Sequence, residues 1–177
     1  MTQAPTILLA DARQAGHLLG WLRSAYAFYV HDLSEFDPER YHLTSGGRWE
    51  PDYLSYWLEQ PFCRPLVALA DGLPIGFAFV GQPPFPFMSP SCDFHLGEFF
   101  VLRSHRRSGL GRAVAITVFS QLPGLWELRV LPRNTPAAKF WRSVIPRVST
   151  GAPKEASDAQ GVQLVFSTAD ILSGKKL

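Results

Sequence analysis

The spacing of hydrophobic and polar residues changes along the chain between strand-like and helical patterns, which predicts a mixture of both elements. A short apolar run at 6–10 is typical of a buried strand. Apolar residues then recur at helical spacing over about 12–30, so we expect a long amphipathic helix there. A polar stretch at 31–50, broken by proline and glycine, predicts a loop. A second helix is expected to begin at Pro51, because proline suits the first helical position.

The middle of the chain has the pattern of a hairpin followed by a further strand. Two apolar runs at 65–70 and 75–80 flank Asp71-Gly72, a strong signal for a hairpin turn. The four prolines between 82 and 90 exclude a central strand, because proline cannot donate a ladder hydrogen bond. The next strand is predicted over 94–102.

The rest of the chain alternates between helix and strand. Asn134, followed by proline two residues later, has the pattern of a helix N-terminus. We expect helices over 109–122 and 134–144, a strand over 126–131, and a final strand pair over 147–150 and 162–168. Strands and helices in this order indicate an α/β or α+β layered fold, in which helices cover a sheet.

Composition limits the class of protein. A chain of 177 residues with 46% hydrophobic and 18% charged residues can build a sizeable core, and we expect one domain over 1–177. Two cysteines, Cys63 and Cys92, are too few for a disulfide framework or, unaided, for a structural zinc site. The first residues lack the basic and apolar regions of a secretory signal, and no apolar stretch is long enough to span a membrane. We therefore expect a cytoplasmic protein without a membrane partner.

Charge is distributed unevenly, although the formal net charge is only +2. Residues 31–60 contain seven acids and two arginines, whereas 101–147 contain nine Lys/Arg and one acid, Glu127. The separation suggests one anionic and one cationic ligand, with two ordinary solvated faces as the alternative. We expect no nucleic-acid partner, because the basic segment lacks interleaved exposed aromatic residues and any zinc or recognition-helix motif.

The segment 99–112, FFVLRSHRRSGLGR, has the features of an anion-binding turn. An apolar strand leads into a basic turn with two glycines and then into a helix, whose first N–H groups and dipole favour negative charge. Arg103, Arg106, Arg107 and Arg112 add positive charge suited to pyrophosphate and a further phosphate. The pattern is neither a P-loop nor a complete GxGxxG motif. A solvated basic turn is the alternative interpretation.

Two segments resemble the signatures of the GNAT superfamily of acyl-CoA-dependent acetyltransferases. Residues 106–111, RRSGLG, are similar to the pattern Arg/Gln-x-x-Gly-x-Gly/Ala. Residues 134–141, NTPAAKFW, resemble the second signature, Asn-x-x-Ala-x-x-Phe-Tyr. The order of elements also matches over nearly the whole chain. The resemblance implies a mixed, largely antiparallel sheet that is splayed at its middle and covered by helices on both faces.

The resemblance implies acetyl-CoA as a co-substrate and assigns residues to it. Strand backbone would pair with the pantetheine arm, and the turn would bind the pyrophosphate. On the helix over 134–144, Asn134 would hydrogen-bond the pantetheine or thiol region, and Phe140 and Trp141 would pack beside the cofactor. The assigned residues are Phe99, Phe100, Val101, Arg106, Arg107, Ser108, Gly109, Leu110, Gly111, Arg112, Asn134, Phe140 and Trp141.

Trp141 departs from the signature, in which a tyrosine is often assigned as the acid that protonates the leaving thiolate. An indole N–H cannot act as a general acid near neutral pH. Either another group or water protonates the thiolate, or the thiolate needs no dedicated acid.

Transfer to an amine requires a base that removes a proton from the ammonium group. The resemblance implies His95 or Glu98, both on the strand over 94–102. Strict alternation places His95 on the face of Phe99 and Val101, and Glu98 on the opposite face. A bulge in this strand would change the alternation and bring Glu98 inward instead.

The acceptor side is expected to come from the first two helices and the loop between them. The resemblance implies that this region lines the acceptor pocket, and we expect Tyr26, Tyr29, Asp32 and Glu35 to contact the acceptor. Since acids attract cations and aromatic rings enclose amines, a cationic acceptor is expected.

The resemblance thus implies an N-acetyltransferase that moves an acetyl group directly from acetyl-CoA to a primary amine. The acceptor is a small molecule or a peptide; polyamine, amino acid, antibiotic, peptide N-terminus and protein lysine all remain open. The alternative function is a GNAT-fold sensor that binds acyl-CoA without turnover. A homodimer is compatible with either function.

Overall fold

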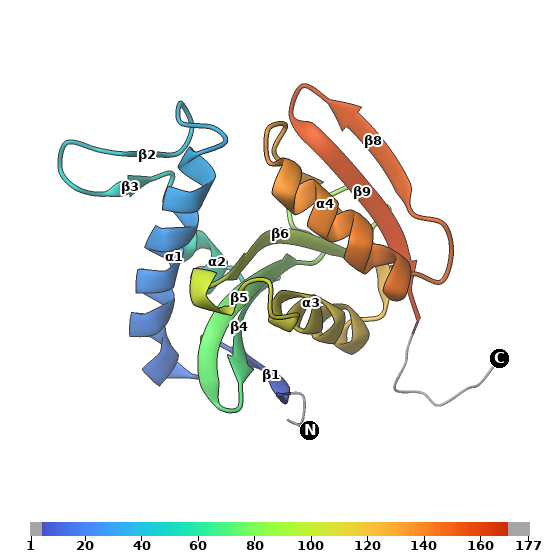
Figure 1. The fold of residues 1–177 in the computed structure, drawn as a ribbon, viewed down its shortest axis with the longest axis horizontal. Coiled ribbons are helices and arrows are strands. Elements are labelled where there is room, and N and C mark those ends of the chain that lie inside the picture. The colour runs from blue at the N-terminus through green and yellow to red at the C-terminus, as the bar shows by residue number, and fades with distance from the viewer. Residues whose placement is uncertain (1–4, 170–177) are drawn as a thin grey trace.

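The computed structural model describes residues 5–169, and its largest element is a seven-stranded sheet (Figure 1). The strands of this sheet are β1 (Ile7–Asp11), β4 (Cys63–Ala70), β5 (Leu73–Gly81), β6 (Phe94–Val101), β7 (Gly124–Val130), β8 (Lys154–Asp158) and β9 (Gly161–Thr168). Their spatial order is β1-β4-β5-β6-β7-β9-β8. Within these strands, every neighbouring pair is antiparallel except β6 and β7, which run parallel.

Helices cover both faces of the sheet, as the resemblance implied. They are α1 (Leu19–Ser34), α2 (Leu54–Glu59), α3 (Leu110–Gln121) and α4 (Thr135–Val144), with 3₁₀ turns at Gly16–Leu18, Arg103–His105 and Ile145–Arg147. One core cluster joins α1 and α2 to β4 and β5, and another joins α3 and α4 to β6, β7 and β9. A short hairpin of β2 (His42–Leu43) and β3 (Trp49–Glu50) lies beyond α1 (Figure 1). No helix among residues 5–169 is both long and apolar enough to cross a membrane.

Local sequence signals explain where several elements begin and turn. Asn134 caps α4, because its side-chain oxygen accepts a hydrogen bond from the backbone N–H of Ala137 at 3.1 Å. Asp71 and Gly72, with φ of 48° and 82°, form the left-handed turn between β4 and β5. The side chain of Asp52 accepts the N–H of Leu54, where α2 begins.

Four elements differ from the sequence-based expectation. The second helix, α2, begins at Leu54 rather than at Pro51. The first long helix begins at Leu19 rather than at residue 12, and the expected loop over 31–50 contains the end of α1 and the β2–β3 hairpin. The partner of β9 is β8, not 147–150, which contributes only an isolated bridge from Ser149. All five residues of β8 are exposed, so this edge strand carries no hydrophobic pattern that would reveal it.

The sheet opens between β6 and β7. These strands pair over only three residues, 94–96 with 126–128, and then separate. From residue 97 onward, β6 pairs with β5 alone among the described strands. The parallel pair therefore divides the sheet at its centre and exposes one edge of β6.

A β-bulge interrupts β6 at this point. Val80 of β5 is paired with Leu96, but Phe79 is paired with Glu98, so Gly97 is the additional residue in β6. The bulge presses against α2, because a Cβ at position 97 would lie only 2.5 Å from the Trp57 ring. Glycine is therefore the residue that this close approach requires.

Candidate active site

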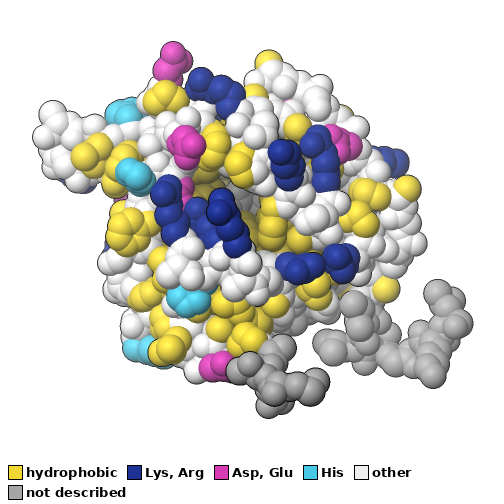
Figure 2. Space-filling view, viewed as in Figure 1, with side chains coloured by type: hydrophobic (Ala, Val, Ile, Leu, Met, Phe, Trp, Pro, Cys, Tyr) yellow, Lys and Arg dark blue, Asp and Glu magenta, His cyan; other side chains and the backbone are white. Residues whose placement is uncertain are grey.

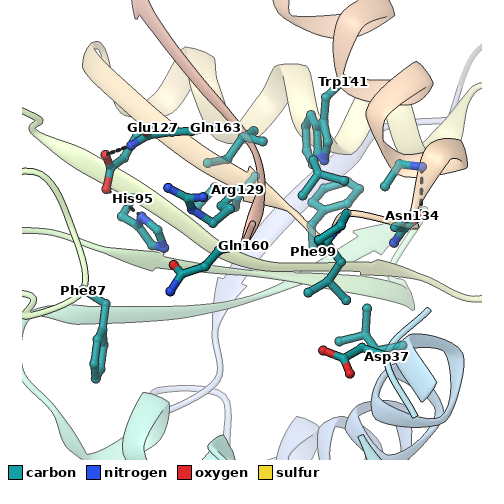
Figure 3. Close-up of a pocket in the computed structure, with 18 of the residues that line it drawn as sticks. Asp37, Phe87, His95, Phe99, Glu127, Arg129, Asn134, Trp141, Gln160 and Gln163 are labelled. Atoms are coloured by element: carbon teal, nitrogen blue, oxygen red, sulfur yellow. Dashed lines mark hydrogen bonds and ion pairs between the residues drawn. The ribbon is translucent and has the colours of Figure 1, made fainter. Parts of the chain in front are cut away.

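A cleft of about 830 Å³ occupies the opening between β6 and β7. Asn134 and Trp141 lie at one end, Phe87 lies at the other, and His95 and Arg129 lie between them (Figure 3). Lys and Arg side chains surround a hollow on the face that Figure 2 shows. The volume is in the range of small-molecule sites, and the cleft has a polar and an aromatic part.

The basic turn between β6 and α3 presents backbone N–H groups. Gly109 is the N-cap residue of α3 and has φ of +88°, a conformation that favours glycine. Gly109 has no side chain to cap α3, and Ser108 Oγ accepts a long hydrogen bond from the N–H of Leu110 at 3.4 Å. The first N–H groups of a helix have no intrahelical partners, so the next ones remain available to a ligand. The site therefore has the backbone geometry and dipole that suit a phosphate group.

The arginines of this turn have different partners. The Nε of Arg106 donates to the carbonyl oxygen of Val101 at 2.7 Å, and both Arg106 and Arg103 donate to the carboxylate of Asp32 on α1. Arg106 thus holds the turn against β6 and α1. Arg107 and Arg112 are exposed and make no side-chain hydrogen bond or ion pair with the described residues.

The residues that the resemblance assigns to the thiol region come together around Phe99. The ring of Phe99 lies 5.0 Å from Trp141 and 5.7 Å from Phe140 between centroids, and Trp141 also packs on Phe119. Trp141 and Asn134 line the cleft. The Oδ1 of Asn134 is engaged in capping α4, so its amide NH₂ is the group available to a ligand.

His95 and Glu127 form a pair at the point where the strands separate. They are direct partners in the β6–β7 register, and His95 Nδ1 lies 2.9 Å from Glu127 Oε1. The carboxylate also accepts hydrogen bonds from the backbone N–H and hydroxyl of Ser89 and from the amide of Gln163. Burial acts to raise the pKa of Glu127, but the hydrogen bonds from His95 and Ser89 outweigh it and hold the pKa at about 2.

This pairing determines which nitrogen of His95 faces the cleft. Glu127 is ionised at neutral pH and can only accept hydrogen bonds, so Nδ1 of His95 carries the proton in their contact. The other ring nitrogen, Nε2, is then free to accept a proton when the ring is neutral. His95 lines the cleft with 15% of its side chain exposed and stacks on Phe85.

Glu98 lies in the core beneath α1 and α2 and does not line the cleft. Its Oε1 accepts hydrogen bonds from the indole N–H of Trp57 at 2.8 Å and the hydroxyl of Tyr26 at 3.2 Å, while Oε2 has no partner among the described residues. Burial raises the pKa of Glu98 to about 8, although the two hydrogen bonds act to lower it. The carboxyl group is therefore mainly protonated at neutral pH.

Because of the bulge at Gly97, the side chains of β6 do not alternate strictly between the two faces as expected. Gly97 and Glu98 both face α2, since a Cβ at position 97 would contact Trp57 and Glu98 receives the hydrogen bond of the same ring. His95 therefore lies on the face of Glu98, and Phe99 packs on the opposite face with α4. The predicted shared face of His95, Phe99 and Val101 was therefore wrong. The bulge considered as the alternative is present, but it does not bring Glu98 into the cleft in place of His95.

Of the four residues expected on the acceptor side, the structure brings only Tyr29 to the cleft. Tyr26 is buried in the core, where its hydroxyl donates to Glu98. Asp32 is bound by Arg103 and Arg106, and Glu35 is exposed outside the cleft. Asp32 and Glu35 therefore add no free negative charge to the cleft, which removes the electrostatic argument that these two acids gave for a cationic acceptor.

The structure adds cleft residues that sequence reasoning missed. They are Asp37, Arg40, Phe87, Glu127, Arg129, Gln160 and Gln163. Glu127 had a visible signal, because it is the one acid in the basic segment 101–147. The pairing of Glu127 with His95, 32 residues earlier, depends on strand register and has no local signal.

The fold occurs in solved acetyltransferases. The aminoglycoside acetyltransferase AAC(6')-Ib, solved in complex with coenzyme A, aligns over 97% of this chain and 100% of its own, with 16% identity and a TM-score of 0.61. An acetyltransferase from Thermus thermophilus aligns over 93% and 97%, with 15% identity and a TM-score of 0.56. No match was found among the curated proteins.

The family model of the Acetyltransferase (GNAT) family matches residues 27–144, which is most of the chain and includes both signature segments. The chain belongs to this family of acetyltransferases. The resemblance in the sequence and the expected fold class are thereby confirmed.

Proposed function

We propose that this protein is an N-acetyltransferase that transfers an acetyl group directly from acetyl-CoA to a primary amine. The observation that carries the proposal is His95, which Glu127 holds in the cleft where β6 and β7 separate. Family membership supports acetyl transfer in general, and the arrangement of His95 supplies the base that an amine acceptor requires.

The chain has groups that fit acetyl-CoA along the whole opening. The exposed edge of β6 over 97–101 can pair with the amides of the pantetheine arm, as an added strand would. The N–H groups at the start of α3 fit the pyrophosphate, and Arg107 and Arg112 are the turn's arginines without an acidic partner among the described residues. Asn134 and Trp141 lie at the end of the cleft next to this edge.

In the proposed reaction, Nε2 of His95 accepts a proton from the ammonium group, directly or through water. The neutral amine then attacks the thioester carbonyl, so that a C–N bond forms and the C–S bond breaks. The ammonium group gives up two protons in total: one ends on the CoA sulfur and one is released. Because the indole of Trp141 does not ionise near neutral pH, the sulfur takes its proton from His95 or from solvent.

Turnover of acetyl-CoA with a panel of amines tests this function. We expect free CoA thiol and acetylated amine, identified by mass spectrometry, to appear in equal amounts. The protein incubated with acetyl-CoA alone should gain no acetyl group, because the transfer is direct. Calorimetric binding of acetyl-CoA without product from any amine would favour the sensor function instead.

A matched pair of arginine variants tests the phosphate site in the same preparation. Arg107→Ala should weaken acetyl-CoA binding by about 1–3 kcal/mol if it loses a charge-assisted contact, and the loss should shrink with added salt. Arg23→Ala, on the exposed surface of α1, is the control and should leave binding unchanged. Equal affinities of the two variants would remove Arg107 from the phosphate site.

A further inference from the structure

Arg129 introduces a positive charge into the acceptor part of the cleft. It follows Glu127 by two residues on β7, so both side chains lie on the same face of the sheet. Arg129, His95 and Gln160 line the same part of the cleft, as Figure 3 shows. About a third of its side chain, 33%, is exposed. Its Nη1 donates to Asp158 at 2.6 Å, and its other N–H groups have no partner among residues 5–169.

The carboxylates near this position are already engaged. Glu127 receives hydrogen bonds from His95, Ser89 and Gln163, and Asp32 is bound by two arginines outside the cleft. Among the described lining residues, Asp37 and Glu127 are balanced by Arg40 and Arg129. Asp37 makes no ion pair with the described residues, so a polycation would meet one free carboxylate in the cleft lining, together with the guanidinium of Arg129, whose charge Asp158 partly offsets.

One small molecule can bridge His95 and Arg129. His95 is the register partner of Glu127 on the adjacent strand, and Arg129 follows Glu127 by two residues, so the two backbone positions lie about 4.8 Å apart across the sheet and about 7 Å apart along it. Hydrogen bonds of about 2.9 Å from each side reduce the distance that a ligand must span. Adjacent amino and carboxylate groups of one amino acid fit such a span. A planar guanidinium is also the side chain best suited to hold a carboxylate.

We propose, on the basis of the function proposed above, that the acceptor is an amino acid whose free carboxylate binds Arg129 and whose α-amine lies at His95. The amide of Gln160 provides a further donor beside the carboxylate. Phe87, 72% exposed at the far end of the cleft, and Met88 provide an apolar wall for the side group.

Matched trios of compounds test this inference. Each trio consists of an amino acid, its carboxamide and its decarboxylated amine, and trios built on alanine, leucine, phenylalanine and glutamate vary the side group. The free acid should be acetylated with kcat/KM about tenfold to a hundredfold higher than the other two members in at least one trio. The carboxamide has the less basic amine and more of it is neutral, so this preference would oppose intrinsic reactivity.

Variants of Arg129 determine whether the preference arises from this side chain. Arg129→Gln should abolish the preference for the acid, Arg129→Lys should retain part of it, and Arg23→Gln should leave it unchanged. Calorimetric titration of the same compounds into protein saturated with CoA measures recognition without turnover. It therefore decides the inference even if acetylation fails. Equal binding of all three members in every trio, or a preference that survives Arg129→Gln, would overturn it.

Discussion

Glu98 and Glu127 occupy neighbouring strands of the sheet, and only 8% and 3% of these residues are exposed, yet their surroundings give them opposite charge states. Glu127 faces the opening between β6 and β7 and accepts hydrogen bonds from Ser89, Cys92, His95 and Gln163. Those from His95 and Ser89 lower its pKa and keep it ionised. Glu98 faces the aromatic core beneath α1 and α2, where one of its oxygens has no partner among the described residues.

The difference shows that hydrogen-bond donors, rather than depth alone, decide the charge of a buried carboxyl group. A pKa of about 2 makes Glu127 an acceptor that can orient His95, whereas a pKa of about 8 leaves Glu98 mainly neutral. Of the two residues considered as the base, only His95 combines access to the cleft with an ionised partner. Substitutions at the opening between β6 and β7 and in the core beneath α1 and α2 can test this difference between the two glutamates.

The largest effect is expected for His95→Ala. Loss of a general base typically lowers the rate by about 10²–10⁴, so kcat/KM should fall by this factor while acetyl-CoA affinity stays unchanged. The acidic limb of the pH–rate profile should disappear, because it reports deprotonation of the base. Glu98→Gln is the control and should keep this limb. The opposite pattern in the two variants would assign the base to Glu98.

The next effect concerns stability and Glu98. Folding raises the pKa of this carboxyl from an ordinary value of 4.5 to about 8, so the folded protein binds the proton more tightly between these pH values. Stability should therefore fall as pH rises from about 4.5 to 8, with an upper bound of about 5 kcal/mol. In urea unfolding at pH 5 and pH 8, Glu98→Gln should gain stability relative to the unchanged protein at the higher pH. If the two proteins differed in stability by the same amount at pH 5 and pH 8, Glu98 would have to be charged in the folded core.

Glu127 should show the opposite sign. Its folded pKa of about 2 lies below the ordinary 4.5, so its contribution to stability is present above pH 4.5 and is lost as pH falls toward 2. This contribution amounts to about 3 kcal/mol. Unfolding experiments should find Glu127→Gln less stable than the unchanged protein at pH 6, with the two converging in acid. If the stabilities of the two proteins changed with pH in parallel, the hydrogen bonds of Glu127 would not favour its charged form.

The smallest effect is expected at the surface, where Asp32 extends the comparison to a third carboxylate. Burial acts to raise the pKa of Asp32, but hydrogen bonds from Arg103 and Arg106 lower it overall. A partly exposed ion pair contributes about 1 kcal/mol or less, so Asp32→Asn should change stability little. Steady-state kinetics should show an unchanged KM for the amine. An increased KM for the amine with normal acetyl-CoA binding would return Asp32 to the acceptor side.

Elements with local signals were predicted well from the sequence. The turn at Asp71-Gly72, the N-cap at Asn134 and the glycine-rich turn before α3 each depend on a few consecutive residues, and the structure has all three. The same holds for the strand that carries His95. The edge strand β8 was missed, because no buried face imposes a pattern on it.

Features that depend on contacts between distant segments could not be predicted. Asp32 and Arg106 are 74 residues apart, and the sequence alone gives no indication that their charges cancel. The local excess of acids over 31–60 therefore suggested more negative charge at the acceptor site than the cleft contains. The contributions of Glu127 and Arg129 likewise follow from the register of β6 against β7 and from the place where these strands separate.

The bulge at Gly97 makes the site sensitive to the length of β6 as well as to its residue types. Deleting this one residue would restore a regular ladder between β5 and β6, in which His95 and Glu98 keep their common face. The extra twist and bend that a bulge adds would be lost, so β6 should stay closer to β7 and the cleft should narrow. Inserting a residue after Glu98 would instead exchange the faces of Phe99 and Val101 relative to His95. Substitutions around this position change single contacts, but a change of length alters the course or the phase of the whole strand.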